Sequence, residues 1–393
     1  MAKVTLTPDS GFARELMEAG GESLKKCYQC ATCAVACPMA PANHPYPRKE
    51  MVWAQWGLKD KLTADPDIWL CHNCGNCAEL CPRGANPADV MAAARNVMYK
   101  DLCKPAKIGE LMSSKKGLFK LFLIPAVLWL LIWTIRAACV GSFFPRTPEG
   151  KIVFGQIFYG DYTIDPIFMV TFFGALWIMY KGCSRLWNMF KSNDGKVLVI
   201  GPTKPWYVHL ASLLWDEIGS HKKFETCTSG PKTGQPENSR KFGHQCVVYG
   251  FVALMVVTAV VAGGHWIGKV IPCLSIHTPM PTMYPIKILA NVGAILLLVG
   301  LFALTVRRKN QNPKFFSSSY QDWYLLGLIW AIALTGCFSQ MFRLFDWVYF
   351  AYTVYYLHLV FVWMLFAYLP WSKLGHLCYR TAALLYVRMY GRG

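Results

Sequence analysis

Two runs of four cysteines with the same spacing constrain this chain of 393 residues more than any other feature. Each run reads C-x2-C-x2-C-x3-C-P, and the eight positions are Cys27, Cys30, Cys33, Cys37, Cys71, Cys74, Cys77 and Cys81. This spacing lets three thiolates surround one face of a 4Fe–4S cubane, while the proline turns the fourth cysteine towards a neighbouring cluster. Zinc sites use pairs of ligands, and a disulfide framework would not repeat the spacing. The repeat therefore predicts two 4Fe–4S clusters.

Most of the remaining sequence is apolar. Hydrophobic residues make up 54% of the chain, with 15 Trp and 19 Tyr, a composition typical of membrane spans with aromatic belts. We expect six spans of about 20 residues, each long enough to cross about 30 Å of hydrocarbon. They cover approximately 118–140, 166–186, 245–267, 285–306, 322–342 and 347–369.

The net charge of +18 is explained better by a membrane protein than by nucleic-acid binding, because Lys and Arg flank the apolar spans. With six spans, all of these basic groups fall on one side of the membrane. The positive-inside rule then predicts an inner-membrane protein with both termini in the cytoplasm. The N-terminal stretch has no apolar signal-peptide segment, so we also expect the cysteine runs in the cytoplasm.

These features predict an all-α protein of two domains. A cytoplasmic domain of the α-helical ferredoxin type is expected at 1–105, followed by a membrane domain at 106–393. Asn86-Pro87 is a good helix start, with a capping residue before a proline at the first helical position. A cytoplasmic connector at 191–240 is expected to contain an amphipathic stretch.

Histidines in or near the spans are candidate axial ligands of haem b, in which two imidazoles from different helices hold the iron. His265 follows two glycines at the outer end of the third span, where a flat macrocycle can approach the backbone. His244 lies at the inner end of the same span. His358 lies in the last span, and His376 follows 18 residues later, which on one helix means five turns or about 27 Å.

Matching depths pair His265 with His358 and His244 with His376, which predicts two haems b. On the connector, His209 is the substitute for His244, and His221 is a weaker candidate. Each of these residues can instead be a hydrogen-bonded core or interfacial histidine. We expect His72, beside the clusters, to be exposed to solvent.

The N-terminal 105 residues resemble the C subunit of heterodisulfide reductases, an electron relay with two cubanes. The resemblance to the α-helical ferredoxin type implies that each run completes the cluster of the other. The implied ligand sets are Cys27, Cys30, Cys33 and Cys81 for one cluster, and Cys71, Cys74, Cys77 and Cys37 for the other.

The segments Tyr356-Leu-His358 and Leu369-Pro370-Trp-Ser-Lys-Leu-Gly-His376 resemble the last helix of the respiratory nitrate reductase gamma subunit family. Two haem ligands flank a similar element there. Gly263-Gly264-His265-Trp266 resembles the Gly-Gly-His ligand motif of that family. The chain departs from it at the fourth ligand, because the equivalent position is near Met255 and His244 is chosen by depth alone.

A relay of this kind fused to such a membrane domain resembles the C subunit of quinone-interacting membrane-bound oxidoreductase (Qmo) complexes of sulfate reducers. The resemblance implies menaquinol oxidation as part of an enzyme complex. It also implies soluble flavin- and iron–sulfur-containing subunits A and B as partners, with electrons delivered towards adenylylsulfate reductase.

Two alternatives use the same residues. One is a membrane subunit of a heterodisulfide-reductase-like or Dsr-type complex, and the other is a haem-free iron–sulfur membrane anchor whose histidines are structural. The sequence contains no G-x-G-x-x-G dinucleotide loop and no acid–base constellation for a soluble substrate. Quinol is therefore the substrate that we expect this chain to handle.

Overall fold

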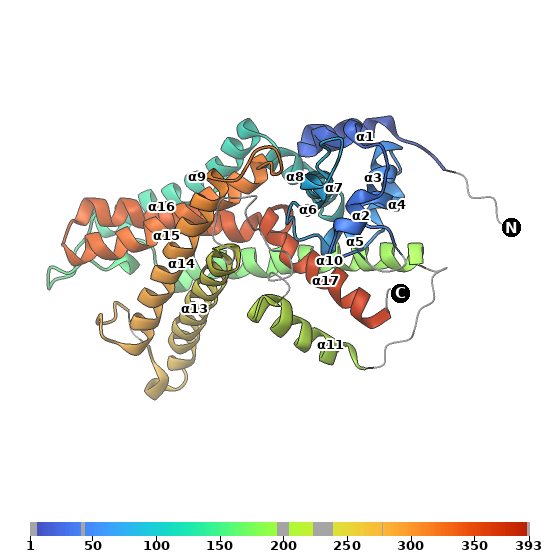
Figure 1. Cartoon of the computed structure of the whole chain (residues 1–393). Coiled ribbons are helices and arrows are strands. Elements are labelled where there is room, and N and C mark those ends of the chain that lie inside the picture. The colour runs from blue at the N-terminus through green and yellow to red at the C-terminus, as the bar shows by residue number, and fades with distance from the viewer. Residues whose placement is uncertain (1–5, 41–43, 195–203, 223–238, 277, 391–393) are drawn as a thin grey trace.

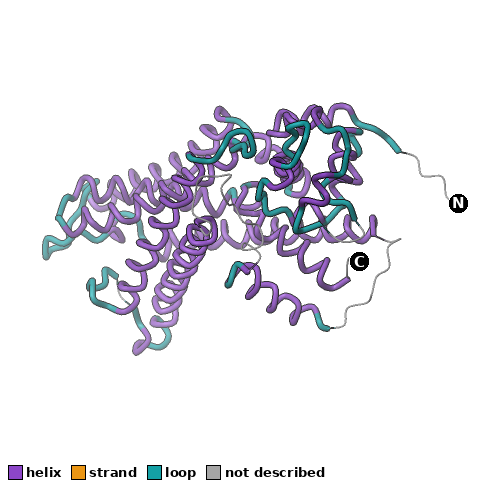
Figure 2. The backbone as a smooth tube through the Cα atoms, viewed as in Figure 1, coloured by secondary structure: helices purple, strands orange, loops and turns teal. Residues whose placement is uncertain are grey.

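The computed structural model describes residues 6–40, 44–194, 204–222, 239–276 and 278–390 (Figure 1). Across these residues the regular secondary structure is entirely helical, and no strand occurs in them (Figure 2). The all-α prediction is confirmed for this part of the chain.

The N-terminal region consists of short helices around the two cysteine runs. Its helices are α1 (Ser10–Leu16), α2 (Thr32–Ala36), α3 (Arg48–Gln55), α4 (Lys59–Thr63), α5 (Asp67–Leu70), α6 (Asn76–Glu79), α7 (Pro87–Leu102) and α8 (Ala106–Met112). The predicted start of α7 is confirmed, with Pro87 in its first turn. The Asn86 side chain does not cap this helix, however, but donates to Asp89 and to the Lys314 carbonyl.

Among the described residues, six helices are long and apolar enough to cross a membrane. They are α9 (Lys115–Val140), α10 (Asp165–Asp194), α13 (Ser239–Gly268), α14 (Pro285–Lys309), α15 (Tyr320–Leu344) and α16 (Val348–Ala367). Every predicted span coincides with one of these helices, and most of the helices extend beyond the predicted span at one or both ends. The chain thus has the helices of a multi-pass membrane protein.

These long helices are arranged as a bundle and a hairpin (Figure 1). Helices α9, α10 and α15 all pack against α16, whereas α13 packs mainly against α14. The hairpin is tight because glycines face one another: a Cβ on Gly250 would lie 2.8 Å from the Gly293 carbonyl oxygen. Glycine at such crossings lets two backbones approach closely. Helix α14 contacts α15, which connects the hairpin to the bundle.

The last of the six long helices does not continue to His376. The prediction that His358 and His376 lie five turns apart on one helix is therefore wrong. Helix α16 ends at Ala367, two short 3₁₀ turns follow, and α17 (His376–Tyr390) then begins. Pro370 explains the break, because proline lacks an N–H and clashes with the preceding helical turn. His358 and His376 are therefore on separate helices.

Helix α17 connects the N-terminal region to the membrane helices. Tyr379 packs against Trp69 and Tyr99, with ring centroids 5.5 and 5.7 Å away, and its hydroxyl lies 2.7 Å from the Cys103 thiol. Helix α11 (Trp206–Leu213), from the predicted amphipathic stretch, packs against α17 on another side. One continuous buried core therefore extends from α1 to the membrane helices.

Candidate iron–sulfur and histidine centres

Both cysteine runs adopt the same unusual backbone. Gln29 and Ala31 have φ of 61° and 69°, and Asn73 and Gly75, at the equivalent positions, have φ of 50° and 84°. Left-handed backbone costs a non-glycine residue roughly 1–2 kcal/mol, so its repetition indicates a common requirement. These residues turn the chain between successive cysteines.

The turns direct backbone N–H groups at sulfur. The Gln29 N–H donates to Cys27 Sγ at 3.4 Å, and the Asn73 N–H donates to Cys71 Sγ at 3.3 Å. The Ala85 N–H donates to Cys81 Sγ at 3.3 Å. Such bonds stabilise negative charge on sulfur, which is the form that binds iron.

Thiols from the two runs lie in two mixed groups. Cys33 interacts electrostatically with Cys27, Cys30 and Cys81. Cys77 interacts in the same way with Cys71, Cys74 and Cys37, and these four line one pocket together with Tyr46 and His72. The structure thus brings together the same two sets that the resemblance implied. Their roles as cluster ligands remain a prediction.

Burial opposes ionisation of most of these thiols when they carry no metal. It raises the pKa of Cys33 to about 11 and that of Cys37 to about 12. In contrast, the hydroxyl of Thr32 lowers the pKa of exposed Cys30. A cluster bound here would have to displace protons from the buried thiols, and its iron would provide positive charge where like-charged thiolates repel.

The second run is held by two arginines of the membrane region. Arg380 of α17 donates to the Cys71 carbonyl at 3.2 Å and to the His72 ring at 2.9 Å. Arg240 of α13 donates to the carbonyls of His72 and Asn73. His72 is buried, so the expectation of an exposed histidine was wrong. The arginines that bury it could not be inferred from local sequence.

The loop between α14 and α15 covers the same run from another side. A Cβ on Gly75 would lie 2.6 Å from the Phe316 ring, so only glycine fits there. The Ser317 N–H donates to Asp89 Oδ2 at 3.2 Å. The second run is consequently enclosed by parts of the membrane region.

Three histidines gather next to these arginines. His244 Nδ1 lies 2.7 Å from His221 Nε2, and His244 also interacts electrostatically with His376. His221 comes from the connector, where it was the weaker of the two candidates. The predicted inner pair, His244 and His376, is therefore brought into one neighbourhood, with His221 as an added member.

Hydrogen bonds assign the protons of these rings. His376 Nδ1 contacts the Lys373 carbonyl oxygen, which can only accept, so Nδ1 carries the proton and Nε2 the lone pair. His221 Nδ1 donates to the Gly219 carbonyl at 3.3 Å, so its Nε2 accepts from His244 Nδ1. Burial lowers the pKa of His376 to about 4 and also lowers that of His221, which keeps both neutral. His376, with its Nδ1 proton held by a carbonyl and its lone pair on Nε2, therefore suits a metal.

His358 is oriented in the same way inside the bundle. Its Nδ1 lies 3.1 Å from the hydroxyl oxygen of Thr335 on α15. That hydroxyl donates to the Ala331 carbonyl at 2.6 Å, so the His358 Nδ1–H donates to it. Gly336 leaves space for the ring, since a Cβ there would lie 3.1 Å from His358 Cε1. His358 thus presents Nε2 as an acceptor.

His265 has a different environment. Its Nε2 pairs with Asp161 at 2.5 Å, and Lys269 pairs with the other oxygen of the same carboxylate at 2.6 Å. Helix α13, which carries His265, packs mainly against α14, whereas α16 packs mainly against α15. His265 and His358 therefore have separate partners, and their pairing remains a prediction. His209, on α11, has a buried Nε2 that finds no hydrogen-bond partner among the described residues.

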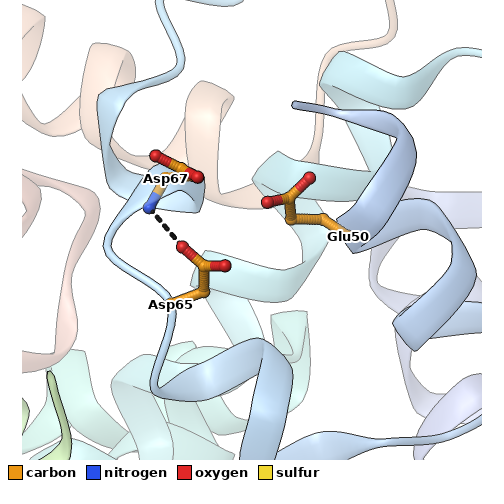
Figure 3. A group of neighbouring side chains, drawn as sticks. All are labelled: Glu50, Asp65 and Asp67. Carbon is orange, nitrogen blue, oxygen red and sulfur yellow. Dashed lines mark hydrogen bonds between the residues drawn. The ribbon is translucent and has the colours of Figure 1, made fainter. Parts of the chain in front are cut away.

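An acidic group lies behind the second cysteine set. Glu50, Asp65 and Asp67 are buried with ligand atoms within 4.8 Å of one another (Figure 3). Lys49 Nζ lies 3.3, 2.6 and 3.2 Å from these carboxylates, so an ammonium already provides their positive charge. Glu50 also interacts with Tyr46, which lines the pocket of the second set.

The helical fold and the two thiol sets define an iron–sulfur electron-transfer protein with membrane-type helices. Residues 23–85 match the family model of the 4Fe-4S dicluster domain. The chain belongs to the family described as citrate utilization protein B, whose model matches residues 160–392.

Curated relatives agree with both matches. The N-terminal region is 40% identical over 93 residues to the C subunit of the H(2):CoB-CoM heterodisulfide,ferredoxin reductase of Methanothermobacter marburgensis, covering 23% of this chain and 50% of that protein. It is 39% identical over 90 residues to an Archaeoglobus profundus protein described as similar to the heterodisulfide reductase C subunit, covering 23% and 48%. The chain thus spans about half the length of these relatives.

A longer similarity covers both regions. Citrate utilization protein B of Escherichia coli is 26% identical over 329 residues, which is 80% of each chain. No solved structure matches this chain. The heterodisulfide reductase relatives are named as subunits of reductases, and this chain shares their iron–sulfur region.

Proposed function

We propose that this chain is the membrane subunit of an oxidoreductase complex that oxidises menaquinol and passes electrons through two haems b and two 4Fe–4S clusters to soluble partners. The partners are flavin- and iron–sulfur-containing subunits A and B of the same complex, which transfer the electrons towards adenylylsulfate reductase. Oxidation of one quinol gives two electrons and two protons, and one-electron carriers must separate these electrons.

One observation carries this proposal: Arg240 and Arg380 hold the second cysteine run beside the His244–His376 group. A haem b bound there would supply a one-electron carrier close to the second thiol set. His376 and His244 would ligate through Nε2, while Lys373 and His221 hold the two rings by their Nδ1 atoms.

The contact between the second cysteine run and the histidine group sets the order in which electrons pass from one redox centre to the next. The second thiol set lies against α13 and α17, whereas the first set includes Cys30, which is exposed. Electrons from the membrane region therefore arrive at the second set and leave the protein from the first. The quinol site belongs further out, where His358 is oriented by Thr335 and where His265 lies next to Asp161.

A visible difference spectrum of the purified chain tests the haem component. Reduction is expected to give a b-type α band, and menadiol is expected to reduce both haems and clusters. His376→Ala should remove one haem and keep the clusters, whereas His209→Ala, at the substitute position, is expected to keep both haems. A wild-type protein without an α band would refute the haem part of the proposal.

A second candidate is a membrane subunit of a heterodisulfide-reductase-like complex. The similarity of the N-terminal region to the heterodisulfide reductase C subunit favours it. The relay inside the chain is the same in both cases, and only the soluble partner differs. Affinity purification from the native membrane decides between them, because flavin-containing subunits would support the first candidate and a heterodisulfide-cleaving subunit the second. A haem-free complex would leave the chain as an iron–sulfur anchor.

A further inference from the structure

The first cysteine run reaches the protein surface among large apolar side chains. Tyr28, Val35 and Leu80 are 68%, 90% and 55% exposed, and the Cys30 thiol is exposed between Tyr28 and Val35 in the sequence. Single exposed apolar residues are ordinary, but several around one redox site mark a contact surface.

These side chains belong to one face. The Arg83 guanidinium lies 4.0 Å from the centre of the Tyr28 ring, which joins the two runs at this point. Cys27 and Cys81, next to Tyr28 and Leu80, interact electrostatically. Val35 belongs to α2, which packs against α6, and Leu80 directly follows α6. The first set of thiols lies directly beneath this face.

The rim of the face is basic. Lys25, Lys26 and Arg83 are exposed, and Glu22 is the exposed carboxylate in the described segments 22–38 and 79–84. A surface with an apolar centre and a positive rim complements a partner with an apolar centre and a negative rim. Positive charge also speeds the approach of an acidic protein.

We propose that this face, formed by Lys25, Lys26, Tyr28, Val35, Leu80 and Arg83, docks the soluble partner that receives the electrons, and that this partner is an acidic one-electron carrier protein whose redox centre lies close to its own surface. The proposal rests on the proposed function, because it takes the first thiol set to be the exit of the relay. Docking covers Cys30, excludes water between the two redox centres and shortens the distance for electron transfer. One electron leaves the chain and the carrier is reduced by one electron.

The test uses the full-length protein in detergent micelles, reduced with dithionite and freed of excess reductant. It is mixed in a stopped-flow instrument with oxidised flavodoxin, an acidic carrier, or with oxidised cytochrome c, a basic one. Val35→Glu and Arg83→Glu should each slow flavodoxin reduction by about tenfold or more, because each places negative charge on the docking face. Leu6→Glu and Lys107→Glu are matched controls at exposed positions elsewhere in the N-terminal region, and should react at the wild-type rate.

The dependence of the electron-transfer rate on salt concentration is an independent test. The flavodoxin rate of the wild type should fall as ionic strength rises, whereas the cytochrome c rate should not. Equal rates for the face variants and the controls would overturn the proposal, and so would a flavodoxin rate that rises with salt. EPR spectra of the reduced variants establish that their clusters are intact. Failure of menadiol to reduce the wild-type clusters would instead count against the proposed function.

Discussion

In the first cysteine run Tyr28 follows the first cysteine and is 68% exposed, whereas in the second run His72 has the same position and is 4% exposed. Arg83, an exposed side chain, stacks on Tyr28, while Arg380 from α17 donates to His72. The local backbone is the same in both runs, with positive φ at the same two positions. The spacing of a run thus determines how it can hold a cluster, and the rest of the chain determines what that cluster faces.

The largest expected effect comes from replacing the fourth cysteine of either run with serine. Cys37→Ser should abolish the EPR signal of the cluster held by Cys71, Cys74 and Cys77, because Cys37 lies with these thiols. Cys81→Ser should abolish the other signal for the matching reason. Iron content should fall by about half in each variant, since one of two clusters is lost. Loss of the cluster of its own run in either variant would contradict the mixed sets.

The left-handed position after the second cysteine offers a matched pair of substitutions. Gly75→Ala should destabilise the protein by about 1–3 kcal/mol, because φ is 84° and a Cβ would lie 2.6 Å from the Phe316 ring. Ala31→Gly at the equivalent position should change stability by less than about 1 kcal/mol, since relieved strain and added chain entropy oppose each other. Thermal unfolding in micelles measures both, and equal effects would mean that the second run is not enclosed.

Alanine in place of the residue after the first cysteine should also destabilise the protein more in the second run than in the first. His72→Ala removes a buried acceptor from Arg380 and should cost about 1–3 kcal/mol. Tyr28→Ala, at an exposed position, should change stability by no more than about 0.5 kcal/mol. Denaturation curves followed by cluster absorbance provide the comparison. A larger loss in the Tyr28 variant would contradict the burial described for His72.

Glu50, which lies behind the second cysteine set, gives the stability of the protein a pH dependence. Burial, followed by the neighbouring Asp65 charge, raises the pKa of Glu50 in the folded protein. A raised carboxyl pKa means that the folded state binds more protons, so its contribution to stability is present at low pH and declines as pH rises from about 4.5 towards the folded pKa. Glu50→Gln should remove a decline of about 1–3 kcal/mol between pH 5 and pH 8 in unfolding measurements. An unchanged pH profile in this variant would show that Glu50 is ionised in the fold.

The sequence was informative wherever a signal was local. The cysteine spacing identified the dicluster region, and apolar length located all six long helices. Pro370 is also a local signal: a proline at this position predicts the break between α16 and α17, which the spacing of His358 and His376 does not.

Contacts between distant segments could not be predicted in this way. His221 and His244 meet across the connector, and Arg240 and Arg380 reach the second run from helices that follow it by more than 150 residues. No periodicity or spacing encodes such contacts, because they depend on how α13 and α17 pack against the N-terminal region. The burial of His72 follows from the same packing, which is why its exposure was predicted wrongly.

The central claim is that the second thiol set stands between the membrane helices and the first set. It is tested most directly by EPR of the two fourth-cysteine variants after anaerobic addition of menadiol, with dithionite as a control that reduces any cluster present. Menadiol is expected to reduce the remaining cluster in Cys81→Ser, which keeps the second set, and to leave the remaining cluster in Cys37→Ser oxidised. Reduction in Cys37→Ser but not in Cys81→Ser would contradict this order.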